Sequence, residues 1–293
     1  MLVIRRYKLL YFLAAFIFTI FWQTDAQARN LFVSPDGNNS DGSSWKKAWQ
    51  TFSDIDWDKV NPGDHIVLDG GTSGITYVGN LTIPEDNIVV RQGRGKNHSG
   101  QVTIQGPHYS QPPVDTGVVF EGSNCHLIGN KRSGIVVKQF SRNLVTMRKN
   151  YCSLRNVEMN RTVGYQPYAG GQIAGVIYGG YCNRVINCDM RDCSNGAVEQ
   201  PVEGVPSLTV FRNCTFGNNG YGYWGHFGTG IVGTSDTSVK SVTHVNHCVF
   251  GPFYNKGIDF KVGDLRVADS LFLGGFQGNL NFLPVSGASA RAV

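Results

Sequence analysis

A four-residue pattern of one polar, one small, one variable and one large apolar residue recurs six times between residues 124 and 272. It occupies residues 124–127, 156–159, 187–190, 213–216, 247–250 and 269–272, at intervals of 22 to 34 residues. Because alternate residues of a β-strand point to opposite faces, the small and the large position of each unit share one face. A repeat of this length predicts a solenoid, in which the strands of successive units stack on one another.

The repeat predicts which side chains fill the interior of the solenoid. The column of small residues is Cys125, Val157, Cys188, Cys214, Cys248 and Ser270. The column of large residues is Leu127, Met159, Met190, Phe216, Phe250 and Phe272. Four units begin with asparagine, a residue that tolerates left-handed backbone at turns and whose amide can bond to a neighbouring coil. We therefore expect a stack at the turn before the strand, formed by Asn124, Asn156, Asn187 and Asn213.

A second element, a glycine followed by apolar residues, recurs about once per coil. It begins at Gly134, Gly175, Gly230 and Gly257, and less regularly at Gly196. Two short strands per coil, joined by loops of unequal length, predict an all-β fold, the right-handed parallel β-helix. The alternative is a β-sandwich in which the repeated Asn-Cys pairs arise by chance.

All seven cysteines lie between Cys125 and Cys248, inside the repeat. Stacked strands are ~4.8 Å apart, which is within the Cα separation that a disulfide allows. Two arrangements are therefore open for Cys188, Cys214 and Cys248, which either form disulfides or stack in the reduced state. Of the two arrangements we favour reduced packing.

The chain is expected to begin with a removable segment and to continue as one domain. Residues 1–28 combine a basic start, an apolar run and a small-residue cleavage site, as a secretory signal does. Residues 29–293 then form the β-helix, with coils over about 64–285. Apolar residues at helical spacing predict a capping helix over about 43–60, which Ser43 or Ser44 would cap. The C-terminal end has no comparable apolar face, so we expect further chain, a partner or a second copy to cover it.

Charge and the length of the apolar run exclude two classes of partner. The formal net charge is +5, and removal of residues 1–28, which hold three basic and one acidic residue, leaves +3. Such a small excess does not favour a nucleic-acid partner. The apolar run is shorter than the ~20 residues of a membrane span. We therefore expect a secreted or periplasmic protein with no membrane attachment after cleavage of the signal.

Five short segments at the beginning of the expected domain carry a family resemblance. Residues 31–37, 41–45, 48–49, 61–64 and 66–68 read Leu-Phe-Val-Ser-Pro-Asp-Gly, Asp-Gly-Ser-Ser-Trp, Ala-Trp, Asn-Pro-Gly-Asp and Ile-Val-Leu. This beginning resembles that of many extracellular β-helix proteins of the pectin-lyase-like superfamily. The resemblance implies the fold, whereas the same beginning precedes lyases, epimerases, hydrolases and proteins with no known chemistry.

Asp259 and Lys261 share one face of an expected strand, with Ile258 and Phe260 on the other. Cleavage of a uronate polymer by β-elimination needs a base that removes the proton beside the carboxylate and a cation that stabilises the enolate. This segment resembles the part of family 9 polysaccharide lyases in which a Gly-Phe-Lys-x-Gly strand supplies a lysine base. The resemblance implies that Lys261 is the base and that Asp259, with Asp236 from the preceding coil, binds Ca²⁺. The alternative is a solvated lysine–aspartate pair.

A glycine-rich aromatic loop over residues 220–227 is the expected sugar-binding element. Its Tyr223 and Trp224 present rings that stack on sugars while their polar ends stay in water. Arg191 is expected to form bidentate contacts with a uronate carboxylate. The alternatives are a loop packed against its own coil and a solvated arginine.

Three functions remain open for the sequence. The first is a secreted lyase that cleaves an acidic polysaccharide by β-elimination, and the second is a non-catalytic carbohydrate-binding or surface-adhesion β-helix. The third is a polygalacturonase-like hydrolase, because His226 stands in a Gly-His segment that resembles that of family 28 glycoside hydrolases. Such a hydrolase uses paired carboxylates. Residues 188–193 offer Asp189 and Asp192, which are not the adjacent Asp pair of that family.

Overall fold

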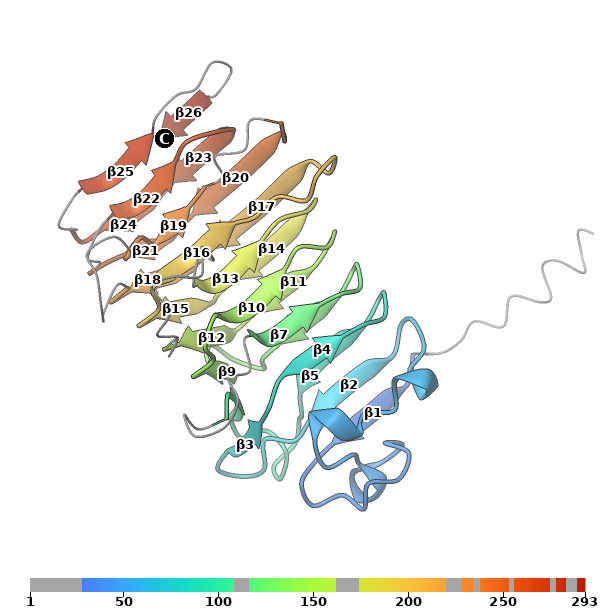
Figure 1. Ribbon diagram of the computed structural model, residues 1–293. Coiled ribbons are helices and arrows are strands. Elements are labelled where there is room, and N and C mark those ends of the chain that lie inside the picture. The colour runs from blue at the N-terminus through green and yellow to red at the C-terminus, as the bar shows by residue number, and fades with distance from the viewer. Residues whose placement is uncertain are drawn as a thin grey trace, which may run out of the picture.

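The chain winds into stacked coils whose strands form three parallel sheets (Figure 1). The computed structural model describes residues 28–107, 116–161, 174–219, 228–233, 238–252, 256–274, 278–282 and 289–292, the last two ranges as backbone only. In this part of the chain no helix is long and apolar enough to span a membrane. The expected signal lies almost entirely in residues 1–27, which are not among those described.

The three sheets are named A, B and C in the order in which the chain visits them. Sheet A consists of β1 (Asn30–Val33), β2 (His65–Leu68), β5 (Val89–Gln92), β8 (His126–Ile128), β11 (Ser153–Arg155), β14 (Asn183–Ile186), β17 (Ser207–Arg212), β20 (Ser241–Asn246), β23 (Asp264–Ala268) and β26 (Ser289–Ala292). Sheet B consists of β3 (Ile75–Val78), β6 (Val102–Gln105), β9 (Ile135–Lys138), β12 (Val157–Asn160), β15 (Asp189–Arg191), β18 (Thr215–Gly217), β21 (Val249–Phe250) and β24 (Leu271–Phe272). Sheet C consists of β4 (Leu81–Ile83), β7 (Thr116–Phe120), β10 (Asn143–Met147), β13 (Ala174–Tyr178), β16 (Asn195–Glu199), β19 (Ile231–Val232), β22 (Lys256–Phe260) and β25 (Gly278–Phe282).

From β2 to β25, each coil contributes one strand to sheet A, then one to sheet B and one to sheet C. The right-handed parallel β-helix predicted from the sequence is therefore confirmed, but the prediction of two strands per coil is wrong. The overlooked strands are those of sheet A. A strand such as β11 has three residues and buries only Leu154 among them, so it leaves too short a pattern to be seen along the chain.

The predicted interior columns hold for most of the repeat. Five of the predicted large residues are register neighbours on consecutive strands of sheet B: Met159, Met190, Phe216, Phe250 and Phe272. The rings of Phe216 and Phe250 stack with centroids 4.7 Å apart, and those of Phe250 and Phe272 do the same. All seven cysteines are free in the structure, and six of them are buried.

The asparagine stack forms where sheet A turns into sheet B. Asn156, Asn187 and Asn213 have φ angles of 59°, 57° and 53° in the left-handed region, and the Asn187 amide donates to Asn156 Oδ1 at 2.6 Å. Asn124 does not belong to this stack, because it lies at the turn into β8 of sheet A and donates to Asn87 Oδ1 at 2.8 Å.

The unit at residues 124–127 was consequently placed in the wrong sheet, since Leu127 pairs with Leu154 of sheet A. An asparagine with left-handed backbone precedes a strand at two corners of the coil. A four-residue sequence pattern does not distinguish these two corners.

The N-terminal cap consists of three short 3-10 turns instead of the expected helix over residues 43–60. They are η1 (Trp45–Lys47), η2 (Phe52–Asp54) and η3 (Trp57–Lys59). Between the first two, Trp49 forms a parallel bridge with Val33, which interrupts any helix. Trp49, Phe52 and Ile55 are nevertheless buried in the core. Ser44 accepts a hydrogen bond from the Lys47 N–H at 3.4 Å, as expected of an N-cap.

A column of glycines runs through sheet C. Four glycines occupy equivalent register positions in consecutive coils. They are Gly175 on β13, Gly196 on β16, Gly230 directly before β19 and Gly257 on β22. At three of them an added Cβ would lie 2.5 to 2.7 Å from the carbonyl oxygen of the next glycine, so only glycine fits. Gly196 therefore belongs fully to this element, whereas Gly134 precedes β9 of sheet B and was assigned to it wrongly.

We expect Gly230→Ala to destabilise the fold by about 1–3 kcal/mol, the usual cost of overpacking a core. The new Cβ would lie 2.5 Å from the Gly257 carbonyl oxygen and 2.7 Å from the Phe250 ring. Gly217→Ala is the matched control, because its Cβ would meet nothing closer than 3.4 Å. Denaturant titration measures both, and equal losses from the two substitutions would show that the close approach is not the cause.

Candidate functional site

The candidate base Lys261 directly follows β22, the strand of sheet C that pairs with β19 and β25. Ile258 and Phe260 of β22 are fully buried in the core. Asp259 is partly buried and Lys261 is exposed. The alternation predicted for this segment is therefore present, and it leaves Lys261 at the solvent-facing end of a rigid strand.

The carboxylate of Asp259 contacts a different lysine of its own strand. Lys256 Nζ lies 3.3 Å from Asp259 Oδ2, and both side chains are partly buried. On the neighbouring strand β19, the register partner of Asp259 is Val232. Val232 packs on a small apolar cluster of Ala174, Ile177 and Val198, which is separate from the main core. The surface beside Asp259 is thus apolar on one side and holds an ion pair on the other.

The described residues do not supply a calcium site at this place. Ca²⁺ takes six to eight oxygen ligands, several of them usually carboxylates. No group of three or more His, Cys, Asp or Glu side chains with metal-binding geometry occurs within the described ranges. Asp259 is engaged by Lys256, and the second expected ligand, Asp236, falls in a range that is not described. We therefore derive no step that depends on calcium.

Arg191 lies on β15 in sheet B, so the structure does not bring it together with Lys261 in sheet C. Its guanidinium is 3.6 Å from Asp189, a buried carboxylate on the same strand. Arg132 binds Asp189 more closely, at 2.5 and 2.9 Å, and also donates to Thr215 Oγ1. Asp189, one of the two carboxylates that a hydrolase would need, is thus held by two arginines.

Burial desolvates the Asp189 carboxylate, but its bonds with Arg132 outweigh this and hold the pKa of Asp189 below its usual range. A depressed folded-state pKa stabilises the fold above the ordinary carboxyl pKa, and this contribution is lost as pH falls through the folded-state value. We expect Arg132→Ala to cost about 1–3 kcal/mol at pH 7, the cost of leaving a buried group without its partner.

The deficit of that variant should stay nearly constant down to the ordinary carboxyl pKa and shrink only as the pH falls below it, and denaturant titrations at pH 7 and at about pH 3 measure it. Arg191→Ala, which removes the longer contact, should cost less than about 1 kcal/mol. A deficit of Arg132→Ala that is the same at both pH values would contradict the role of the Asp189 charge.

The remaining candidates, Tyr223, Trp224 and His226, lie in residues 220–227, for which the structure gives no description. Their part in sugar binding stays a prediction.

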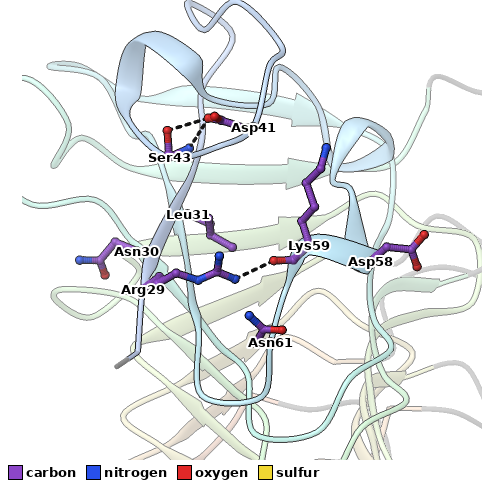
Figure 2. Close-up of a pocket in the computed structure, with 8 residues that line it drawn as sticks. All are labelled: Arg29, Asn30, Leu31, Asp41, Ser43, Asp58, Lys59 and Asn61. Atoms are coloured by element: carbon purple, nitrogen blue, oxygen red, sulfur yellow. Dashed lines mark hydrogen bonds between the residues drawn. The ribbon is translucent and has the colours of Figure 1, made fainter. Parts of the chain in front are cut away.

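A polar hollow of about 510 Å³ lies at the N-terminal end of the β-helix (Figure 2). Arg29 donates to the Lys59 carbonyl oxygen at 2.7 Å across it, and Asp41 accepts from the Ser43 hydroxyl at 2.6 Å. Arg29 also pairs with Asp64 at 2.5 Å. Because these groups bond to one another, the hollow offers little unsatisfied polarity to a ligand.

A larger hollow of about 790 Å³ lies on the outer side of sheet A, where sequence reasoning had placed no candidate residue. Its lining includes four basic side chains and no carboxylate: His65, Arg91, Arg94 and Arg155. His65, Arg91 and Arg155 lie far apart in the sequence and converge only because β2, β5 and β11 belong to one sheet, whereas Arg94 lies shortly after β5. The signal in the sequence was a basic residue at an outward position of each sheet A strand from β2 to β23, which requires those strands to be recognised first.

Comparison with known proteins bears on the fold. No protein-family model matches the sequence, and no curated protein matches it either. Among solved structures, the crystal structure of pectate lyase Pel9A is similar over 91% of this chain and 79% of that chain, with 18% sequence identity and a TM-score of 0.56. A rhamnogalacturonan lyase is similar over 91% of this chain and 84% of that chain, with 15% identity and a TM-score of 0.48. The chain therefore has the parallel β-helix fold that is found in a pectate lyase.

Proposed function

We propose that this protein acts on an acidic polysaccharide outside the cytoplasm and cleaves it by β-elimination, with Lys261 as the base. The fold shared with pectate lyase Pel9A supports a polysaccharide-active protein. The observation that carries the choice of residue is the position of Lys261, exposed at the end of a core strand of sheet C. The signal-like residues 1–28 support export.

In this reaction neutral Lys261 takes the proton from the sugar carbon that bears the carboxylate. The bond from the adjacent ring carbon to the glycosidic oxygen then breaks, that oxygen takes a proton from water, a carbon–carbon double bond remains in the sugar, and Lys261 returns its proton to the solvent. The strand holds the Lys261 backbone in place, so the amine needs only side-chain rotation to reach the substrate. Positive charge near the substrate carboxylate would stabilise the enolate.

A non-catalytic binding protein is the second candidate. The Lys256–Asp259 ion pair favours it, because a carboxylate that is already neutralised by a lysine is a poor metal ligand. Both candidate functions involve binding of an acidic polysaccharide, and they differ in whether the protein then cleaves it.

The test is to incubate the chain lacking residues 1–28 with pectate, alginate and glycosaminoglycans, with added Ca²⁺ or with a chelator. Ultraviolet absorbance follows the unsaturated product, and retention on the immobilised polymers measures binding. Unsaturated product supports the lyase. Binding without product on any polymer favours the second candidate, and neither binding nor product would refute both.

A further inference from the structure

The outer face of sheet A carries a regular row of basic residues. On the strands of this sheet from β2 to β23 the residues that alternate with the core residues point outward, as the burial patterns of β17 and β20 show. The register between strands aligns the outward residues in columns along the helix axis. Each of the eight strands from β2 to β23 has one basic outward residue.

We call this row the basic ladder, and its members in chain order are His65, Arg91, His126, Arg155, Arg184, Arg212, His244 and Arg266. Adjacent strands are ~4.8 Å apart, so the ladder places one basic group on each rung over eight rungs. From His65 to Arg212 the basic residue alternates between two neighbouring columns. Alternation keeps like charges from lying directly opposite each other, where they would repel.

The positive charge of the ladder is not neutralised by the described part of the protein. Among the outward residues of these eight strands, the one carboxylate is Asp264, on the last of them. None of the salt bridges between described residues involves the five arginines of the ladder. Elsewhere the chain does pair buried carboxylates with arginine, as Asp64 and Asp189 show. A row of arginines that form no salt bridge with a described carboxylate attracts a linear polyanion.

The arginines supply the permanent charge of the ladder. Burial lowers the pKa of His65, His126 and His244, and the nearby Arg91, Arg184 and Arg266 lower them further, against a small opposing effect of Asp64 on His65. At neutral pH these imidazoles are therefore uncharged hydrogen-bonding groups.

Three of the first four ladder residues line the hollow of about 790 Å³ on sheet A, namely His65, Arg91 and Arg155. This volume is within the range of small-ligand sites, ~300–1,000 Å³. Besides the basic residues, its lining combines apolar Val89 and Ile128 with polar Ser99, Asn130 and Asn156. Such a lining suits a sugar, which has apolar ring faces, hydroxyl groups and, in a uronate, one carboxylate.

We propose that the basic ladder is a second polymer-binding surface, which holds a linear anionic polysaccharide along the helix axis on sheet A, apart from Lys261 on sheet C. A sugar ring is about as long as one rung, so a polymer with one anionic group per sugar can place anionic groups at the arginine rungs, while the uncharged histidine rungs offer hydrogen bonds. This inference rests on the proposed function only for the class of polymer. The residues and the sheet are different, and binding at the ladder requires no chemistry at Lys261.

A single-stranded nucleic acid fits the ladder less well. Proteins that bind single strands without sequence preference stack bases on aromatic side chains. The outward positions of the eight strands carry isoleucine, valine and polar residues between the basic ones and no aromatic ring other than histidine. We therefore assign the ladder to a polysaccharide.

The test compares two triple variants that remove the same charge. The first replaces three exposed ladder residues, Arg155→Ala, Arg184→Ala and Arg212→Ala. The control replaces three lysines away from sheet A, Lys46→Ala, Lys131→Ala and Lys138→Ala, which lie in the cap, in the turn before β9 and on β9. Both triples are made in a Lys261→Ala background, so that cleavage does not consume the polymer.

Titration calorimetry with polygalacturonate, alginate and heparin at low and at moderate salt gives the affinities, and melting temperatures report folding. We expect the ladder variant to bind at least one of these polymers about tenfold more weakly or worse, and to lose most of the salt dependence. The control should change by less than about twofold. Comparing the affinities for the two uronate polymers with the affinity for heparin distinguishes recognition of carboxylate groups from recognition of sulfate groups.

Equal losses from the two triples, or no loss from the ladder variant at an unchanged melting temperature, would overturn the proposal. Tighter binding of single-stranded DNA than of every polysaccharide, lost in the ladder variant, would overturn the assignment of the polymer. The proposed lyase activity is judged separately, by ultraviolet product from the protein with Lys261 intact, so either idea can fail alone.

Discussion

Replacing Lys261 with alanine should lower turnover on a uronate polymer by roughly 10²–10⁴-fold, the usual effect of losing a positioned base. Binding should change little, because the base acts mainly in the transition state, and kcat should therefore fall without a comparable change in KM. Product absorbance over a range of substrate concentrations measures both.

Lys261→Arg should fail nearly as badly as Lys261→Ala. A lysine can act as a base only in its neutral form, whereas arginine stays protonated at any working pH. Lys240→Ala is the matched control, since Lys240 is also an exposed lysine next to a strand but lies before β20 of sheet A. If activity survives in Lys261→Ala, another residue is the base, and the role proposed for Lys261 is wrong.

Sheets B and C could be predicted because their strands carry a local pattern. The stack of Phe216 and Phe250 was predicted correctly because each phenylalanine follows an asparagine or histidine by three residues, and the left-handed residue fixes where the strand begins. Asn124 was misplaced because the same turn chemistry occurs at two corners of the coil. The cap was misjudged because Trp49, Phe52 and Ile55 satisfy helical spacing while Trp49 pairs like a strand residue.

Only the part of the candidate site that lies along one strand could be predicted from the sequence. Alternation along β22 placed Ile258 and Phe260 inside and left Lys261 exposed. The partner of Asp259 depends on how the Lys256 side chain folds back along the strand, which alternation does not specify. The basic ladder was not foreseen, because each of its rungs is one residue in a coil and the residues become neighbours only through the register of sheet A.

Replacing Phe250 with alanine should destabilise the fold by about 3–5 kcal/mol, as expected for truncating a fully buried aromatic side chain. The Phe250 ring lies between those of Phe216 and Phe272, at 4.7 Å from each and nearly parallel to both. Its removal therefore opens a cavity and breaks two ring stacks. Denaturant titration gives the loss in the free energy of unfolding.

Phe272→Ala is the informative comparison for this prediction. Phe272 occupies the same column but is only partly buried, and Phe250 is the one ring in the described chain that stacks on it. In a solenoid each coil contacts only its neighbours, so a residue with one stacked neighbour should matter less than a residue with two. Phe272→Ala should accordingly cost less than Phe250→Ala. A loss below about 1 kcal/mol for Phe250→Ala would mean that its ring faces solvent, since a shift of one residue in register turns a strand side chain to the opposite face.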